Sequence, residues 1–250
     1  MKDMPDEFIA GRNSVLEALK AGRPINKILV AKGERQGSVK EIIALAKEQG
    51  LVVQDVDSAK LDSLTQGLKH QGVVAATSPV DYAELSDLWA KAAAKNEPPF
   101  FILLDELEDP HNLGAILRTA DAAGAHGVLI PKRRSCPLSG TVAKTSAGAI
   151  EHVPVARIGN VAQTIKELKK MGCWIVGADM AGSQNYYQAD LTGPIVVVIG
   201  NEGQGLSRLT KETCDFLVKI PMKGKIASLN ASVACSLILY EVFRQREEGR

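Results

Sequence analysis

The sequence has 250 residues, 45% of them hydrophobic, and a formal net charge of only +1 at pH 7. This length is enough for two modest domains with cores of their own, so folding needs neither disulfides nor a metal ion. The near-neutral charge excludes the strongly basic character that many nucleic-acid-binding domains have. Any contact with nucleic acid must come from local basic clusters, and a solvated surface run is the alternative for each candidate. The candidates are Lys132, Arg133 and Arg134, and Lys219, Lys223 and Lys225.

The cysteine pattern and the amino terminus bear on where the protein works. The four cysteines lie far apart, with no CxxC or Cys/His pairing, so neither a zinc site nor a disulfide framework is predicted. The first residues, MKDMPDEFIAGRN, lack the apolar stretch of a signal peptide. No apolar run approaches the roughly 20 residues that span a bilayer. We therefore expect a cytoplasmic protein with reduced thiols, no bound metal and no membrane contact.

The first part of the chain predicts a small α/β module over residues 1–77. NSVLEALK at 13–20 has the spacing of an amphipathic helix, and EIIALAKEQG at 41–50 has helical spacing that ends at Gly50. The predicted strands are KILVA at 27–31, LVVQDV at 51–56 and GVVAAT at 72–77. Residues 78–98 combine a polar start, an Ala/Lys helix and a pair of prolines, a composition typical of a linker.

From residue 99 to residue 250, strands alternate with helices. Helices are predicted at 110–123, near 160–171 and at about 229–246. The predicted strands are FFILLD, GVLIP, HVPVARI, CWIVGAD, IVVVIG and DFLVKIP. Continuous apolar strands that alternate with helices indicate a largely parallel sheet covered on both faces. The second domain is therefore expected to be of the α/β class.

Three stretches of this second half carry polar residues between the end of a predicted strand and the helix that follows it. The first is DPHNLGAILRTADAAG at 109–124, in which Asp109 and Pro110 form a strong helix start. Asn112 lies in the first turn, and the apolar stripe of the helix places Arg118 away from the buried face. Ligands of open α/β sheets bind at such places, although capping and solvation would also explain these two residues.

The second stretch is IVVVIGNEGQGLS at 195–207. Glycines at the end of a strand let the backbone approach a ligand closely, and an ordinary glycine turn with a surface glutamate is the alternative. The spacing matches neither a phosphate loop nor a dinucleotide fingerprint, which argues against an NTPase and a dehydrogenase. The third stretch is KIPMKGKIASLNASVACSLILYE at 219–241. Its Ser228, Asn230 and Ser232 exceed what one helix cap requires and suit a neutral or zwitterionic ligand.

Together these three stretches resemble the motifs of the SpoU/TrmH family of RNA 2′-O-ribose methyltransferases. Asn112 and Arg118 match the polar positions of the first motif, Glu202 in IGNEGQGLS that of the second, and Ser228 and Asn230 in IPMKGKIASLNASVA those of the third. The resemblance covers residues 100–245. Residues 7–77, which include EFIAGRNSVLEAL and KHQGVVA, are similar to the RNA-binding domain of the same family.

The resemblance implies a SPOUT-type α/β trefoil-knot domain with a parallel sheet, preceded by a small ribosomal-protein-L30e-like domain. It further implies S-adenosylmethionine as cofactor, without a metal, and a homodimer whose interface completes the site. By position, Gly200, Ile220 and Leu229 would hold the cofactor through their backbones. Residues expected beside it are Gly177 and its turn GADM, Asn201, Gly203 and Met222.

The implied reaction is methyl transfer to a ribose 2′-hydroxyl, so RNA rather than DNA is the expected partner. The family's arginine at the position of Arg118 is often assigned as the base that takes the hydroxyl proton. Holding a phosphate and stabilising the developing alkoxide is the chemically easier role for a guanidinium, and both roles stay open. Asn112 and Glu202 would orient Arg118 and the nucleotide, and Ser228 and Asn230 would shape the pocket. KTSAGAIEHVPV at 144–155 resembles the branch that methylates a guanosine of large-subunit (23S) ribosomal RNA.

Several alternatives stay open at this point. They are a transfer-RNA methyltransferase, an antibiotic-resistance ribosomal-RNA methyltransferase, and a non-catalytic RNA-binding protein of ribosome assembly. The histidines are ambiguous, because surface or capping roles suit His111 and His152 as well as a role in the site does. His70 in KHQG could contact RNA from the small domain.

Overall fold

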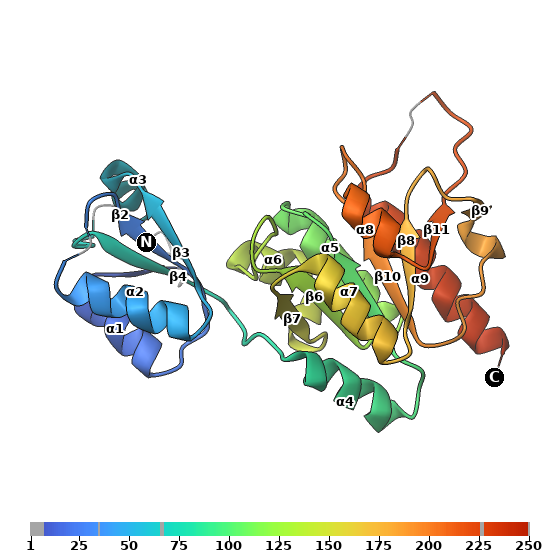
Figure 1. The fold of residues 1–250 in the computed structure, drawn as a ribbon, viewed down its shortest axis with the longest axis horizontal. Coiled ribbons are helices and arrows are strands. Elements are labelled where there is room, and N and C mark those ends of the chain that lie inside the picture. The colour runs from blue at the N-terminus through green and yellow to red at the C-terminus, as the bar shows by residue number, and fades with distance from the viewer. Residues whose placement is uncertain (1–7, 35, 66–67, 226–227, 250) are drawn as a thin grey trace. The chain divides into compact units, whose positions relative to one another are not determined.

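The computed structural model describes residues 8–34, 36–65, 68–225 and 228–249. The chain forms two compact units (Figure 1). The first consists of Met1–Asp81 and Pro137–Gly140, and the second of Tyr82–Cys136 and Thr141–Arg250. No helix in the described ranges is long and apolar enough to cross a membrane.

The first unit is a four-stranded sheet with helices on both faces. Its elements are β1 (Phe8–Ala10), α1 (Arg12–Lys20), β2 (Ile25–Ala31), α2 (Ser38–Glu48), β3 (Val52–Val56), α3 (Ser58–Leu64) and β4 (Val73–Thr77). The strand order is β1-β4-β2-β3, with only β2 and β3 parallel. Successive side chains of a strand point to opposite faces. Ile28 and Val30 therefore pack with α1 and α2, whereas Leu29 packs with Leu61 of α3.

The second unit is built on a seven-stranded sheet in which every neighbouring pair is parallel. Its strands are β5 (Phe100–Leu104), β6 (Gly127–Pro131), β7 (Val155–Ile158), β8 (Trp174–Ala178), β9 (Gln184–Asn185), β10 (Ile195–Ile199) and β11 (Phe216–Lys219). Its helices are α4 (Leu85–Lys95), α5 (Pro110–Ala122), α6 (Gly140–Thr145), η1 (Ala149–Glu151), α7 (Val161–Lys170), η2 (Tyr186–Gln188), α8 (Arg208–Thr213) and α9 (Ala231–Glu248).

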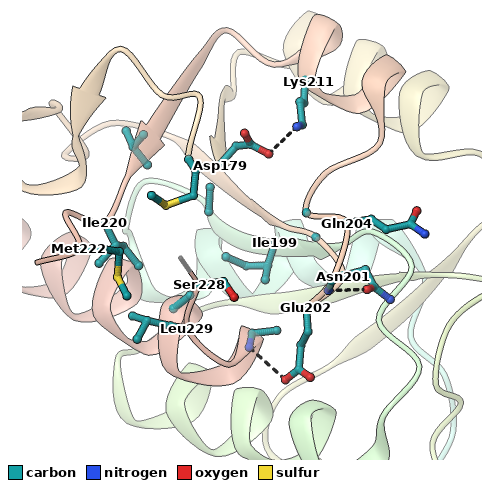
Figure 2. Close-up of a pocket in the computed structure, with 18 residues that line it drawn as sticks. Asp179, Ile199, Asn201, Glu202, Gln204, Lys211, Ile220, Met222, Ser228 and Leu229 are labelled. Atoms are coloured by element: carbon teal, nitrogen blue, oxygen red, sulfur yellow. Dashed lines mark hydrogen bonds and ion pairs between the residues drawn. The ribbon is translucent and has the colours of Figure 1, made fainter. Parts of the chain in front are cut away.

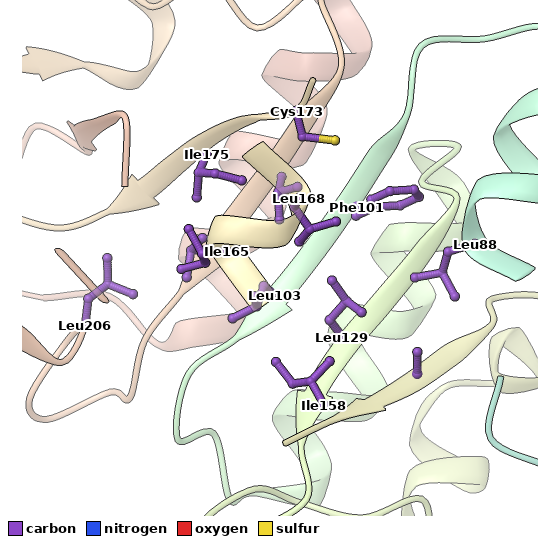
Figure 3. Close-up of a cluster of buried hydrophobic side chains, with 13 residues drawn as sticks. Leu88, Phe101, Leu103, Leu129, Ile158, Ile165, Leu168, Cys173, Ile175 and Leu206 are labelled. Carbon is purple, nitrogen blue, oxygen red and sulfur yellow. The ribbon is translucent and has the colours of Figure 1, made fainter. Parts of the chain in front are cut away.

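The core of this unit explains why its strands are continuous apolar runs. On one face, Phe101 and Leu103 of β5 pack against Leu168 of α7 and Leu88 of α4 (Figure 3). The other face is covered by α5 and α9, which also pack on each other. Both faces of the sheet are therefore buried, as the strand pattern predicted. Helix α4 lies in the segment 78–98 and belongs to the core of the second unit through Leu88.

The sheet order places a switch point beside its central strand. The order is β7-β6-β5-β10-β8-β11-β9, so the chain moves outward from β5 to β7 and later returns to the other side of β10. Where strand connections leave in opposite directions, a crevice opens at the carboxyl ends of the strands. This crevice lies beyond the ends of β8, β10 and β11.

The α/β class, the parallel sheet and the small preceding unit are confirmed. The short elements β1, α3, α6, α8 and β9 were not predicted. Each has two to seven residues, too few for a helical or strand period to show in the sequence.

Candidate functional site

A cavity of about 420 Å³ lies at the carboxyl ends of the central strands of the second unit (Figure 2). Five segments form it: the turns after β8 and β10, helix α8 through Lys211, the segment between β11 and α9, and the first residues of α9. The lining residues are Ala178, Asp179, Met180, Ile199, Gly200, Asn201, Glu202, Gly203, Gln204, Gly205, Lys211, Val218, Ile220, Met222, Ser228, Leu229, Ala231 and Ala234. Pockets of this size and mixed lining hold small molecules.

The turn after β10 is held in one shape by its own backbone. Asn201 N donates to Gly205 O at 3.1 Å, and Gly205 N donates to Asn201 O at 2.8 Å. The Asn201 side chain accepts from Gly203 N at 2.9 Å and donates to Glu106 O at 3.1 Å. A Cβ at Gly200 would lie 2.2 Å from the carbonyl carbon of Gly205. Glycine at 200 is therefore required by the close approach of two backbone segments.

Three polar residues from three distant parts of the sequence meet in a hydrogen-bonded cluster. Asn112 Nδ2 donates to Glu202 Oε1 at 2.9 Å, and Asn230 Nδ2 donates to the same oxygen. Asn230 Nδ2 also donates to Asn112 Oδ1 at 2.9 Å, and Ala231 N lies 3.3 Å from Glu202 Oε1. The cluster thus holds the Glu202 carboxylate by one oxygen and fixes its direction.

The two asparagines are positioned by the starts of two helices. Asp109 caps α5 by accepting from His111 N at 2.9 Å, and its other oxygen accepts from Asn112 Nδ2 at 3.2 Å. Asn230 caps α9 through Oδ1, which accepts from Ser232 N at 3.0 Å and Val233 N at 3.3 Å. Each helix start therefore orients an amide side chain towards the Glu202 carboxylate, in addition to satisfying backbone donors.

Arg118 lies apart from this cluster. It is exposed on α5, and its side chain makes no hydrogen bond or ion pair with any residue that the structure describes. Six residues of helix separate it from Asn112, which amounts to about 9 Å along the axis and a different face. Of the five polar residues matched to the family motifs, the structure joins Asn112, Glu202 and Asn230. It places Ser228 on the wall of the cavity.

Six of the seven residues expected beside the cofactor line the cavity, namely Gly200, Asn201, Gly203, Ile220, Met222 and Leu229. Gly177 is not among the lining residues. A Cβ there would meet the side chains of Leu206 and Leu217 at 2.8 and 2.6 Å, so this glycine serves packing. The turn that follows it does reach the cavity, through Ala178, Asp179 and Met180.

Sequence reasoning missed a charged pair on the cavity wall. Lys211 Nζ lies 2.8 Å from Asp179 Oδ2, and both residues line the cavity. Asp179 belongs to the turn GADM that was expected beside the cofactor, but Lys211 comes from the unpredicted helix α8. The sequence signal was a carboxylate directly after a buried strand, which is a frequent ligand position.

None of the residues of the predicted basic clusters and none of the predicted histidines lines the cavity. Lys132, Arg133 and Arg134 are exposed after β6, and Arg134 pairs with Glu106 at 3.0 Å. Lys219 is half-buried at the end of β11, with Lys223 and Lys225 exposed beyond it. His111 and His152 are exposed, the first within the first turn of α5.

His70 does not point outward as an RNA contact would. Its ring is buried, Nδ1 accepts from Gly72 N at 3.0 Å, and Nε2 lies 3.0 Å from Asp62 Oδ1. These two interactions stabilise the loop before β4. Within the described ranges, no three His, Cys, Asp or Glu side chains gather as metal ligands would. No disulfide joins the four cysteines, and burial raises the pKa of both Cys136 and Cys214 to about 12.

Comparison with known proteins assigns families to both halves of the chain. The model of the SpoU rRNA Methylase family matches residues 99–240. The model described as RNA 2′-O ribose methyltransferase substrate binding matches residues 8–83. The chain is 52% identical over 240 residues to the "Putative TrmH family tRNA/rRNA methyltransferase YacO" of Bacillus subtilis, with 96% of each chain covered.

Solved structures that are similar in fold and sequence include the following three. The SpoU methyltransferase AviRb of Streptomyces viridochromogenes in complex with AdoMet (S-adenosylmethionine) gives a TM-score of 0.61 at 27% identity, covering 97% of this chain and 91% of its own. An AdoMet-bound rRNA methyltransferase from Sinorhizobium meliloti gives 0.59 at 28% identity, covering 95% and 87%. A TrmH/SpoU tRNA modifying enzyme from A. aeolicus gives 0.55 at 33% identity, but covers 61% of this chain and 77% of its own.

Proposed function

Because the chain belongs to the SpoU rRNA Methylase family, we propose that it methylates the ribose 2′-hydroxyl of a guanosine in 23S ribosomal RNA, in the cytoplasm. The protein is an RNA methyltransferase, and its methyl donor is S-adenosylmethionine. We also propose that the second unit contains the trefoil knot expected for this family. The observation that carries the proposal is the cluster of Asn112, Glu202 and Asn230 at the edge of a small-molecule cavity.

The cavity fits the cofactor in size and chemistry. Its volume of about 420 Å³ lies within the usual range for small-molecule sites. The Gly200 backbone would approach the ligand without an intervening side chain, and Ile220 and Leu229 would offer their backbone groups. Ile199 and Met222 add apolar walls. When bound, S-adenosylmethionine supplies an electrophilic methyl group on a sulfonium.

The polar cluster would position the nucleotide that receives the methyl group. Glu202 is held at Oε1 by N–H donors, and its Oε2 takes no hydrogen bond from the described residues. This oxygen can accept from the substrate, with Asn112 and Asn230 fixing its direction. Ser228 would shape the ribose pocket. Aligned reactants can lower a barrier by on the order of 7 to 11 kcal/mol, so positioning alone can supply much of the catalysis.

We assign Arg118 to the site of a second copy of the chain in a homodimer. Its guanidinium would hold the phosphate next to the target ribose and stabilise the developing alkoxide. An apolar stripe on α9, the helix that packs against α5, supports this assembly. It consists of Val233, Leu237, Tyr240 and Phe243, which are 47%, 37%, 49% and 41% exposed. Because these residues are three or four apart, they form one helical face that a second copy would cover.

Mixing two inactive variants tests the homodimer. In the proposed homodimer, each site combines Glu202 of one copy with Arg118 of the other. A homodimer of Arg118→Ala or of Glu202→Ala therefore lacks one of these two residues in both sites, whereas a mixed dimer has one site with both residues and one site with neither. After the variants are unfolded and refolded together, random pairing predicts recovery of about a quarter of the wild-type methyl transfer. Recovery of nothing, with both variants folded and dimeric, would place Arg118 outside the partner's site.

The first unit would hold the RNA backbone. An open concavity of about 690 Å³ includes Arg12, Lys32, Ser38 and Ser58. These residues lie at the starts of α1, α2 and α3 and after β2, where backbone N–H groups of helix starts favour phosphate. The hydrogen bond and charge of Asp57 raise the pKa of Lys32, which keeps its ammonium charged.

Ribosomal RNA is favoured over transfer RNA as the substrate because a solved rRNA methyltransferase matches more of this chain than a solved tRNA modifying enzyme does. The rRNA methyltransferase from S. meliloti covers 95% of it, and the tRNA modifying enzyme from A. aeolicus only 61%. The second candidate, a transfer-RNA target, is therefore tested in the same experiment.

The test is transfer of labelled methyl from S-adenosylmethionine to total ribosomal and transfer RNA from cells that lack this protein. The site is then mapped by resistance to alkali, with Arg118→Ala as the inactive control. One alkali-resistant guanosine in large-subunit RNA, absent with the control, is the expected result. Label in transfer RNA alone would move the target, and label that stays alkali-sensitive would exclude the ribose as acceptor.

A further inference from the structure

The wall of the cavity opposite Glu202 carries an ion pair that the motifs do not include. Figure 2 shows Asp179 and Lys211 at one side of the cavity and Glu202 at the other. Lys211 Nζ lies 2.8 Å from Asp179 Oδ2, and the Asp179 side chain is only 7% exposed. A carboxylate this enclosed is costly unless it is fully bonded, so its remaining acceptor sites need an explanation.

The described hydrogen bonds and ion pair of Asp179 occupy only part of the acceptor positions of its carboxylate. Oδ2 receives Lys211, and Oδ1 accepts from Ala181 N at 2.9 Å. An ionised carboxylate offers about four acceptor positions, so capacity is left on the side that faces the cavity. Gly205 keeps that side open, because a Cβ at this position would lie 3.0 Å from Asp179 Oδ2, and its φ of +66° also favours glycine.

The two carboxylates of the cavity wall differ in how their charge is balanced. Asp179 is neutralised by Lys211, whereas Glu202 has no cationic partner among the residues described for this chain. A carboxylate with a balanced charge attracts a second cation weakly but still accepts hydrogen bonds from neutral hydroxyls. The Glu202 side, in contrast, attracts positive charge.

We propose that Asp179, held in place by Lys211, accepts hydrogen bonds from the ribose hydroxyls of the cofactor's adenosine. The inference rests on the proposed cofactor. It sets the direction in which the cofactor lies, with its ribose towards Asp179 and its cationic sulfur towards Glu202, where the polar cluster would place the acceptor. Asp179 is then a residue that recognises the cofactor, and Lys211 is a positioning residue that acts through it.

The test measures binding rather than turnover, with S-adenosylhomocysteine and its 2′,3′-dideoxy analogue as probes in calorimetry. Asp179→Asn keeps an oxygen for Ala181 N but loses the charged acceptor. We expect it to weaken S-adenosylhomocysteine about 10- to 100-fold, the range for a hydrogen bond to a charged group. The dideoxy analogue should bind wild type and variant equally, because it has no hydroxyl to lose.

A matched control exists in the same unit. Asp215 also pairs with a lysine, with Lys169 Nζ 2.9 Å from Oδ1, and also accepts from a backbone amide, with Ile175 N 2.8 Å from Oδ2. It does not line the cavity. Asp215→Asn should therefore leave both dissociation constants unchanged. An equal loss of affinity in this variant would mean that any broken ion pair weakens binding, and the proposal would be wrong.

Two further outcomes would overturn the proposal. Equal weakening of the dideoxy analogue by Asp179→Asn would show that the ribose hydroxyls are not what Asp179 binds. A loss confined to S-adenosylhomocysteine, with 5′-methylthioadenosine unaffected, would assign Asp179 to the amino-acid end instead. Failure of the wild-type protein to bind S-adenosylhomocysteine would overturn the proposed cofactor itself, which separates that failure from this one.

Discussion

The cavity of the second unit and the concavity of the first differ in what gives them their shape. The cavity is formed by backbone turns, apolar side chains and a bonded polar cluster around Glu202. The concavity is lined mainly by polar side chains, and its cations are half-exposed or exposed, as in the pairs Arg12–Glu34 and Lys32–Asp57. A site fixed by backbone suits one small molecule, whereas adjustable surface charges suit a polymer whose phosphates repeat.

The largest expected effect comes from removing the central acceptor of the polar cluster. Glu202→Ala leaves the amides of Asn112 and Asn230 without their shared acceptor. We expect methyl transfer to fall about 10²- to 10³-fold, the typical cost of losing one preorganised catalytic group. Single-turnover rates with saturating cofactor measure it. Glu202→Gln keeps an acceptor oxygen and should lose less, and equal rates for both variants would count against this cluster as the centre of positioning.

A glycine-to-alanine substitution tests whether the shape of the cavity depends on the close approach of the Gly200 and Gly205 backbones. Gly200→Ala puts a Cβ 2.2 Å from the Gly205 carbonyl carbon, and such overpacking costs about 1 to 3 kcal/mol. The turn should shift, so the affinity for S-adenosylhomocysteine should fall with the melting temperature. The matched control is Gly193→Ala, since a Cβ at Gly193 would meet nothing within 4 Å. Unchanged binding in Gly200→Ala would mean that the turn does not shape the site.

A charge substitution tests the first unit. Arg12→Ala should weaken RNA binding several-fold and lower the salt slope of the binding constant by about one, as expected for one lost phosphate contact. The affinity for the cofactor should not change. Lys20→Ala at the other end of α1 is the control, because Lys20 lies outside the concavity and pairs with Glu41 at 3.6 Å. A weaker cofactor affinity in Arg12→Ala would contradict the division between the two regions.

The smallest effect is a pH dependence confined to the second unit. His126 is fully buried, Nδ1 accepts from Phe100 N at 3.1 Å, and burial lowers its pKa below the ordinary 6.5. The His126 imidazole therefore binds a proton at a higher pH in the unfolded chain than in the folded chain. Stability should be complete above pH 6.5 and decline below it, by at most about 1.4 kcal/mol per pH unit.

Thermal unfolding from pH 5 to pH 8 measures this dependence. His126→Gln should lower stability at every pH and flatten the slope below pH 6.5. The exposed His152→Gln should keep the slope of the wild type. An unchanged slope in His126→Gln would assign the acid sensitivity to other groups.

The sequence alone determined the elements that are long and periodic, and the residues that adjoin them. Apolar strands such as Ile195–Ile199 and the capped start of α5 follow from local composition, because both faces of the sheet are buried and because Asp109 and Pro110 favour a helix start. Short elements such as β9 and α8 carry too few residues for a period, which is why Lys211 was missed as part of the cavity.

Only the tertiary structure decided which candidates meet. Asn112, Glu202 and Asn230 are separated by 90 and 28 positions in the chain, and the parallel sheet brings them together because its strand ends share one edge. The packing of the second unit also placed Gly177 against Leu206 and left Arg118 exposed on α5, and the packing of the first unit buried the His70 ring. Local sequence fixes how a segment folds, but the direction of a side chain relative to a distant one depends on how the segments pack.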